Sequence, residues 1–425
     1  MTRIKTKSKV KGGALLYSLF VITVVGALTS IVISISYFST IHSIKFREKS
    51  SVLRNTQSGM ELLLSEFPIV EINREITLDL YGDECDSVTL KRLNWGLFEV
   101  VSSKAFRKNK TAIKVALVGQ KFEEETALYL ADRNKPLSLA GKTVVKGKIF
   151  LPKKGVKRAY IEGTTYQGDK LLYGTSQTST KSLPELNKEI NKSMTARLGD
   201  VTLETDSMVP YELFEDSIVQ SFTDKTILAY SSSVIVLENK TCIGNVVIKS
   251  SKGIVVRTNS ILENTLLYAP YIVFENNFTG TVQAFATDSV LVGHHVDLEY
   301  PSGIGLIQLN KSGSKHFVSI GEASLIDGSI VAYQKEYDFR NPIKVSMEKE
   351  SILKGYAYVN GLVELKGSIY GSLYCNRFSL KTPSTVYENH LLNATIDVTQ
   401  RSEMYVGPNL TDNKLGTKEV IQWLN

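Results

Sequence analysis

Three glutamates occur where the sequence could support acid–base chemistry, because each flanks a short run of β-branched and aliphatic residues. Glu238, Glu275 and Glu364 stand at similar register in these runs. Carboxylates held on neighbouring coils of a parallel β-protein could act as general acid and base on a polysaccharide. The solvated edge of a strand ladder explains the same spacing equally well. Both interpretations stay open, and we assign no catalytic residue.

Histidines and cysteines are not spaced as metal ligands. His294 and His295 are adjacent, and neighbours on a strand point to opposite faces and cannot readily share an ion. Cys85, Cys242 and Cys375 lie far apart with no CxxC, and we interpret them as small buried apolar side chains. P-loop, dinucleotide-binding, G-x-S-x-G and H-E-x-x-H motifs do not occur. The sequence therefore predicts no metal site, no cofactor and no enzyme of these classes.

Tyrosines form the last group with binding chemistry. Tyr356, Tyr358, Tyr370 and Tyr374 lie close together in a chain that holds 20 tyrosines. Such a strip could bind a glycan or a partner protein. Cross-strand stacking inside a sheet is the alternative interpretation.

An apolar segment near the N-terminus is the clearest structural element in the sequence. Residues 12–39 contain no charged side chain, and about 20 apolar residues suffice to cross the hydrocarbon core of a membrane. The segment must be helical to satisfy its own backbone in lipid. A cleaved signal peptide would have a shorter apolar region ending in a small-x-small site, so an uncleaved anchor is the favoured interpretation.

Charge around this segment predicts its orientation. Five cations precede it without an acid, namely Arg3, Lys5, Lys7, Lys9 and Lys11. The positive-inside rule then places residues 1–11 in the cytoplasm and the body outside. These five cations also account for most of the net charge of +7, so we expect no nucleic-acid partner.

The sequence KGGALL at residues 11–16, preceded by short basic sequence, resembles the prepilin leader of type IV pilins and type II secretion pseudopilins. The resemblance implies cleavage on the cytoplasmic side at Gly12 and Gly13, leaving the apolar helix in the mature protein. Residues 55–61 resemble the point where the helix of a minor pilin enters the head. Cleavage after Gly12 would make Tyr17 the fifth mature residue, where most pilins have a glutamate. An ordinary signal anchor explains the same segment.

Beyond the membrane segment, amphipathic spacing over residues 40–67 predicts a stalk helix ended by Pro68. Short apolar runs separated by turns predict a small β or α+β domain over residues 68–135. Residues 136–226 are predicted to hold the first strands of a repetitive body, with a helical insertion in which Pro184 stands at a helix start. The C-terminal residues 396–425 are predicted to cap that body.

A repeat of short strands dominates residues 227–395. Alignment on Val236, Val255, Val273 and Leu291 gives spacings of 19, 18 and 18 residues, and later members follow after longer intervals. A fixed period predicts a mainly β fold built as a β-solenoid, a right-handed parallel β-helix with about 18 residues per coil. A β-sandwich or barrel is the rival, with less regular spacing.

Residues 361–373 resemble bactofilins, which are polymer-forming bacterial solenoids. The resemblance implies a similar coil size and end-to-end assembly. Taken together, the sequence predicts a single-pass protein of the bacterial inner membrane with its body periplasmic or extracellular. Its expected role is a structural scaffold for assembly, adhesion or secretion, with protein partners or copies of itself. A membrane-tethered protein that binds or degrades polysaccharide is the alternative.

Overall fold

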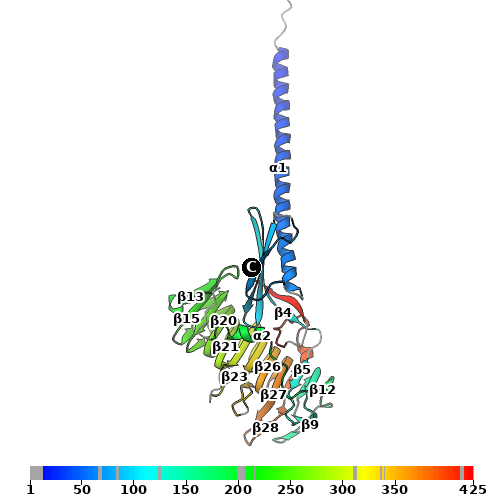
Figure 1. Cartoon of the computed structure of the whole chain (residues 1–425), viewed down its shortest axis with the longest axis vertical. Helices are drawn as coiled ribbons and strands as arrows, with labels where there is room; N and C mark the ends of the chain where they lie inside the picture. Colours follow the sequence, from blue (N-terminus) through cyan, green and yellow to red (C-terminus); the bar gives the residue numbers. More distant parts are fainter. Residues whose placement is uncertain are drawn as a thin grey trace, which may run out of the picture.

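The computed structural model describes residues 13–65, 69–82, 86–122, 126–198, 206–214, 216–309, 314–335, 337–338, 340–411 and 416–424. The chain forms a long N-terminal helix, an antiparallel sheet at its base, and a large stack of parallel strands (Figure 1). This is the mainly β fold with an N-terminal helix that the sequence predicts.

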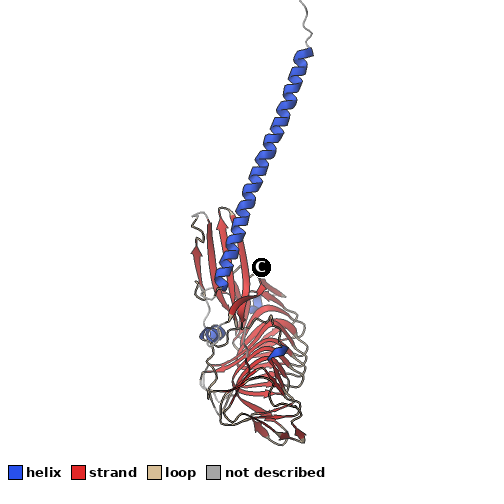
Figure 2. Cartoon of the chain, turned by 90° about the vertical axis from the view of Figure 1, so that its right-hand side faces the viewer, coloured by secondary structure: helices blue, strands red, loops and turns tan. Residues whose placement is uncertain are grey.

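Helix α1 (Gly13–Leu64) runs through the predicted membrane segment and the predicted stalk without a break. At 1.5 Å per residue its 52 residues span about 78 Å. Its first half projects away from the rest of the molecule (Figure 2), and large apolar side chains from Leu15 to Phe38 are exposed there. Its last part buries Val52, Met60 and Leu63 against the sheet. One helix therefore carries two environments.

The antiparallel sheet has the strand order β1-β2-β3-β4-β31. Its strands are β1 (Arg74–Leu78), β2 (Asp86–Trp95), β3 (Phe98–Arg107), β4 (Lys110–Lys121) and β31 (Thr417–Trp423). Strand β31 is the C-terminal segment that we predicted to cap the repetitive body. It instead pairs with β4, so the parallel stack is an insertion between the last two strands of this sheet.

The parallel stack confirms the repeat seen in the sequence. Val236 pairs with Val255, Val255 with Val273, and Val273 with Leu291. The next partner in this column is Ser319, one residue after the member expected from the sequence. Residues one position earlier in each strand, such as Ile254, are fully buried, so the inward apolar column lies beside the aligned one.

Two separate segments of the chain build this stack. The first contains β5 (Thr126–Leu130), β6 (Leu137–Ala140), β7 (Val144–Lys146), β8 (Lys148–Leu151), β9 (Val156–Arg158), β10 (Tyr160–Ile161), β11 (Thr164–Thr165) and β12 (Ser176–Thr178). The second begins with β13 (Asp206–Pro210), η1 (Tyr211–Leu213), β14 (Ser217–Gln220), β15 (Thr226–Ser231), β16 (Ile235–Leu237), β17 (Thr241–Gly244), β18 (Val246–Ser250) and β19 (Gly253–Val256). It continues with β20 (Ile261–Phe274), β21 (Thr279–Val292), β22 (Asp297–Gln308), β23 (Phe317–Ile320), β24 (Leu325–Gln334), β25 (Lys344–Met347), β26 (Ile352–Leu365), β27 (Ser368–Lys381), β28 (Val386–Glu388), β29 (His390–Leu392), β30 (Thr395–Asp397) and η2 (Val398–Gln400).

The two segments join inside the stack rather than at its ends. Strand β27 pairs in parallel with β5, and β30 pairs in parallel with β7. The chain therefore enters the stack near the end formed by β12, winds to β12, crosses to β13 at the other end, and winds back toward its point of entry (Figure 1). The first segment completes the coils that the second one begins.

Helix α2 (Lys188–Thr195) lies on the crossing between the segments. We expected a helix starting at Pro184, but it begins four residues later. The Asn187 side chain accepts hydrogen bonds from the Glu189 and Ile190 amides, which is the usual way of capping a helix N-terminus.

Candidate functional site

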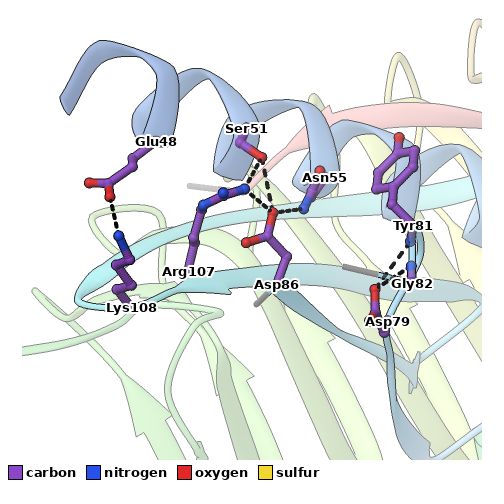
Figure 3. Close-up of polar contacts among 9 residues, drawn as sticks. All are labelled: Glu48, Ser51, Asn55, Asp79, Tyr81, Gly82, Asp86, Arg107 and Lys108. Atoms are coloured by element: carbon purple, nitrogen blue, oxygen red, sulfur yellow. Dashed lines mark hydrogen bonds and ion pairs between the residues drawn. The ribbon is translucent and has the colours of Figure 1, made fainter. Parts of the chain in front are cut away.

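The junction between α1 and the sheet is organised around one buried carboxylate. Asp86, the first residue of β2, pairs across the hairpin with Arg107, the last residue of β3. Its Oδ2 accepts hydrogen bonds from Asn55 Nδ2 at 2.9 Å, Ser51 Oγ at 3.0 Å and Arg107 Nη1 at 2.9 Å (Figure 3). Glu48 pairs with Lys108 one helical turn earlier, at 2.8 Å. The antiparallel sheet and the parallel stack together are called the head below. These contacts fix the direction in which α1 leaves it.

Close packing completes this junction. A Cβ on Gly59 would lie 2.3 Å from Ser103 Oγ and 2.8 Å from Leu90 Cδ2, so the helix backbone touches the sheet directly. Asn55 and Thr56 are buried in the same interface. Residues 55–61 thus lie where α1 meets the head, as the sequence indicated.

Replacing Asp86 by alanine should destabilise this junction by about 3 kcal/mol. The Arg107 cation and the Ser51 and Asn55 donors would lose the buried carboxylate that accepts their hydrogen bonds. The measurement is the change in unfolding free energy of the purified chain in detergent. Glu71→Ala is the matched control, since its ion pair with Arg74 is exposed on both sides and should contribute less than about 0.5 kcal/mol. Equal effects of the two substitutions would show that the carboxylate does not hold the helix.

A second junction fixes the sheet to the stack. Gln283 of β21 accepts a hydrogen bond from the Leu97 amide at 2.7 Å and donates one to the Trp95 carbonyl at 3.2 Å. Ser193 of α2 donates to the Gly96 carbonyl at 2.5 Å. The β2–β3 turn is therefore bound by both α2 and the stack.

The return of the chain supplies a further attachment. The Gln120 amide donates to the Gly407 carbonyl at 2.7 Å, and the Gly407 amide donates back at 3.0 Å. Tyr405 is buried beside this bridge, with its ring 5.4 Å from those of Tyr300 and Tyr356. Helix, sheet and stack are thus bonded into one unit, and the position of α1 determines the position of the stack.

The glutamates considered for catalysis do not converge. Glu238 is exposed, Glu275 pairs with Arg257, and Glu364 is buried between Lys344 and Lys366. Strand register places Glu275 and Glu364 four coils apart, or about 19 Å at the usual strand spacing, which exceeds the separation used by carboxylate pairs that cleave glycosides. Glu238 and Glu275 are two coils apart, or about 10 Å, and Arg257, which binds Glu275, comes from the coil between them.

The predicted tyrosine strip lies mostly inside the protein. Tyr356, Tyr358 and Tyr374 are buried, and Tyr370 is half-buried. Tyr374 stacks on Tyr129 with ring centroids 5.7 Å apart, and Tyr358 continues the column at 6.4 Å. The burial of three members removes them as an exposed glycan or partner surface. Their stacking instead crosses the joint between the two segments of the stack.

The other candidate groups have structural surroundings. His294 and His295 lie in a turn rather than on a strand, and His294 Nδ1 accepts a hydrogen bond from the Glu322 amide at 3.1 Å. Burial raises the pKa of the Cys242 thiol to about 12 and that of Cys375 further still, while Cys85 lies outside the described residues. Across the described parts of the chain, no cluster of three or more His, Cys, Asp or Glu side chains is placed to hold a metal.

Two hollows border the junctions. One, of about 280 Å³, lies between the sheet and α2, and it contains the pair Arg92–Glu99 at 2.8 Å with Lys418 3.4 Å from the same carboxylate. Burial lowers the pKa of Lys418, and Glu99 opposes that shift. These charges come from β2, β3 and β31, so they bind one another across the sheet. The other hollow, of about 650 Å³, lies where α1 leaves the head.

Comparison with known proteins assigns no family. No family model matches the chain, and no curated protein matches it. Among solved structures, the competence-associated pilin ComZ from Thermus thermophilus is similar at 10% identity, over 89% of this chain and 96% of that one. The TM-score is 0.22, so the overall arrangements of the two chains differ.

Proposed function

We propose that the chain is a pilin-like envelope protein, anchored in the cytoplasmic membrane by α1, whose parallel stack serves as a scaffold outside that membrane. The observation that carries the proposal is the division of α1 into an exposed apolar half and a half packed on the sheet. Among the described residues, α1 is the one helix long and apolar enough to cross a membrane.

The energetic argument for the membrane is simple. Burying a large apolar side chain stabilises by about 1.5–3 kcal/mol, and the exposed stretch from Leu15 to Phe38 holds more than a dozen of them. Their exposure to water would cost tens of kcal/mol, more than the typical stability of a folded protein. A lipid bilayer removes that cost without any change in the head.

The pilin-like part of the proposal rests on three features of this chain. The leader sequence around Gly12 and Gly13 resembles the prepilin processing site, although Gly12 lies outside the described residues. The second half of α1 packs on an antiparallel sheet, as expected for a helix that enters a globular head. The insertion between β4 and β31 then adds the scaffold. Self-assembly or protein partners in the envelope fit this role, and we propose no enzymatic activity and no cofactor.

A reporter fused after Asn425 tests the orientation. Alkaline phosphatase should be active there and a cytoplasmic fluorescent protein should be dark, because basic residues 1–11 hold the N-terminus inside. The measurement compares both reporters at that position with the same reporters fused directly after residue 11, where the apolar segment is missing and the fusion should stay in the cytoplasm. A fluorescent full-length fusion without phosphatase activity would overturn the proposed location.

N-terminal sequencing of the membrane form tests the processing. Pilin-like cleavage predicts a mature chain that begins at Gly13, and Gly12→Val should leave it uncut while it still inserts. A mature chain that begins at residue 1 or 2 would contradict pilin-like cleavage and would show that the helix is an ordinary signal anchor.

A further inference from the structure

Cations gather where α1 leaves the head. We call this set the basic collar, and it comprises Lys45, Arg47, Lys49 and Arg54 on α1 with Arg107, Lys108 and Lys110 at the β3–β4 turn. The four helical members are exposed. The carboxylates among the described residues lining or contacting this region are Glu48 and Asp86, and both already bind a collar cation. The collar therefore carries a net positive charge that its own acids do not balance.

The collar surrounds an open hollow rather than a closed site. Arg47, Arg54, Arg107 and Lys108 line the 650 Å³ space, together with Ile44, Phe46, Glu48 and two serines. Hydrogen bonding from Lys108 lowers the pKa of Glu48, and Arg107 and Lys110 add to the effect. Figure 3 shows Arg107 and Lys108 reaching from the turn toward the helix. The positive field thus comes from two elements that meet where α1 leaves the head.

The first cations of the collar lie near the surface of a membrane crossed by α1. Tyr37 and Phe38 end the apolar run, and aromatic side chains typically lie at the membrane–water interface. At 1.5 Å per residue, Lys45 and Lys49 follow Phe38 by about 10 and 16 Å along the helix. The headgroup layer is about 5–8 Å thick, and long basic side chains extend toward it. Lys45, Arg47 and Lys49 consequently lie within about a Debye length of the phosphates, whereas Arg54, about 24 Å beyond Phe38, lies outside it.

Apolar side chains beside the cations agree with this placement. Ile44 is 48% exposed and Phe46 is 66% exposed, both on the collar. Ile44 lies about 9 Å and Phe46 about 12 Å beyond Phe38 along the helix, so both side chains lie beside the cations at the outer side of the headgroup layer. In a pocket for one free phosphate, the cations would cluster around a single position. The collar cations instead extend along ten residues of helix and onto a neighbouring turn.

We propose that the basic collar binds the headgroups of anionic phospholipids in the leaflet from which α1 emerges. The inference rests on the proposed membrane anchoring and names the lipid partner of that anchor. Phosphates of several lipids would contact the cations while Phe46 and Ile44 enter the interface. Because helix, sheet and stack form one bonded unit, this contact would also set the angle at which the stack stands on the membrane.

The test uses the full chain in phosphatidylcholine liposomes that contain a trace of spin-labelled phosphatidylglycerol or spin-labelled phosphatidylcholine. Electron spin resonance gives the relative association constant of the two lipids with the protein. We expect phosphatidylglycerol to be favoured at least about three-fold, since each cation near an anionic surface favours binding about five-fold. The preference should fall in 1 M salt, where the Debye length is about 3 Å.

A charge-matched pair of variants assigns the preference to the collar. The triple variant Lys45→Gln/Arg47→Gln/Lys49→Gln removes the three exposed collar cations nearest the membrane and leaves Arg107 and Lys108 in their ion pairs. The control Lys153→Gln/Lys154→Gln/Lys349→Gln removes three exposed cations from the stack. Both retain the cations of the leader, so the difference between them isolates the collar. We expect the preference to fall at least two-fold in the first and to stay at the wild-type value in the second.

Three outcomes would overturn the proposal. The first is equal association of the two lipids with the protein. The second is an unchanged lipid preference in the collar variant, which would indicate that the collar binds an acidic protein partner instead. The third is loss of the preference when phosphate replaces chloride at constant ionic strength, which would indicate a free-anion pocket. Failure of the anchoring itself gives a different result, because no motionally restricted lipid would then be seen with either label.

Discussion

Replacing Gly355 by alanine is expected to lower the free energy of unfolding of the stack by about 4 kcal/mol. Gly355 lies in β26 with φ +140°, and it pairs with Gly328 in one neighbouring coil and Gly371 in the other. A Cβ there would lie 2.0 Å from the Gly328 carbonyl oxygen. Alanine would therefore add about 1–3 kcal/mol of backbone strain and a similar cost for separating the strands. The fall in the unfolding midpoint of the strand signal in circular dichroism measures it.

The control for this substitution separates strain from collision. Gly163 also has positive φ, at +85°, but no heavy atom lies within 4 Å of the position of its Cβ. Gly163→Ala should cost only about 1 kcal/mol, the strain alone. Similar losses at both positions would mean that coil spacing does not depend on the close approach at Gly355.

The elements of this fold could be predicted because their signals are local. An uncharged run over residues 12–39 is enough to predict a membrane-length helix. A spacing of 18 residues was enough to predict which valines pair, as in Val255 and Val273. Both patterns follow from the rise of a helix and the period of a coil, and neither depends on distant sequence.

The order of stacking could not be predicted, because it depends on contacts between distant segments. Strand β5 joins β27 through Tyr129 and Tyr374, which are more than half the chain apart, and no period connects them. The same is true of β31, which resembled a terminal cap but completes a sheet begun before the stack. The sequence alone does not indicate that β5 pairs with β27 or that β31 pairs with β4.

The site residues divide in the same way. Asp86 and Arg107 could have been found from the hairpin, since they are symmetric about the turn between Trp95 and Phe98, and opposite charges across a hairpin attract. Gln283 carries no such signal, because its partners in the β2–β3 turn are set only by the final packing. The spacing of the tyrosines could not distinguish an exposed binding strip from a buried stack, because it is the same whether they stack under a covering segment or face solvent.

Placing two arginines in the middle of the apolar run is expected to release the chain from the membrane. Val25 and Leu28 are exposed and contact no part of the head, so Val25→Arg/Leu28→Arg should leave the strand signal unchanged. Each arginine at the centre of a membrane helix costs about 3 kcal/mol, and two cost about 6 kcal/mol, or roughly four orders of magnitude in partitioning. The fraction of the chain that resists extraction at alkaline pH should therefore fall from most of it to a small remainder.

The same substitution farther along the helix shows whether position matters. Leu53 is 47% exposed on α1, but it lies beyond the apolar run, level with the head. Leu53→Arg places one arginine on the same helix where water already surrounds it, so the chain should remain fully membrane-bound. If the double variant also resists extraction, the collar or a partner rather than the apolar half of α1 must hold the protein. If Leu53→Arg releases the chain, the anchor must extend to the head, and the division of α1 into two environments would be wrong.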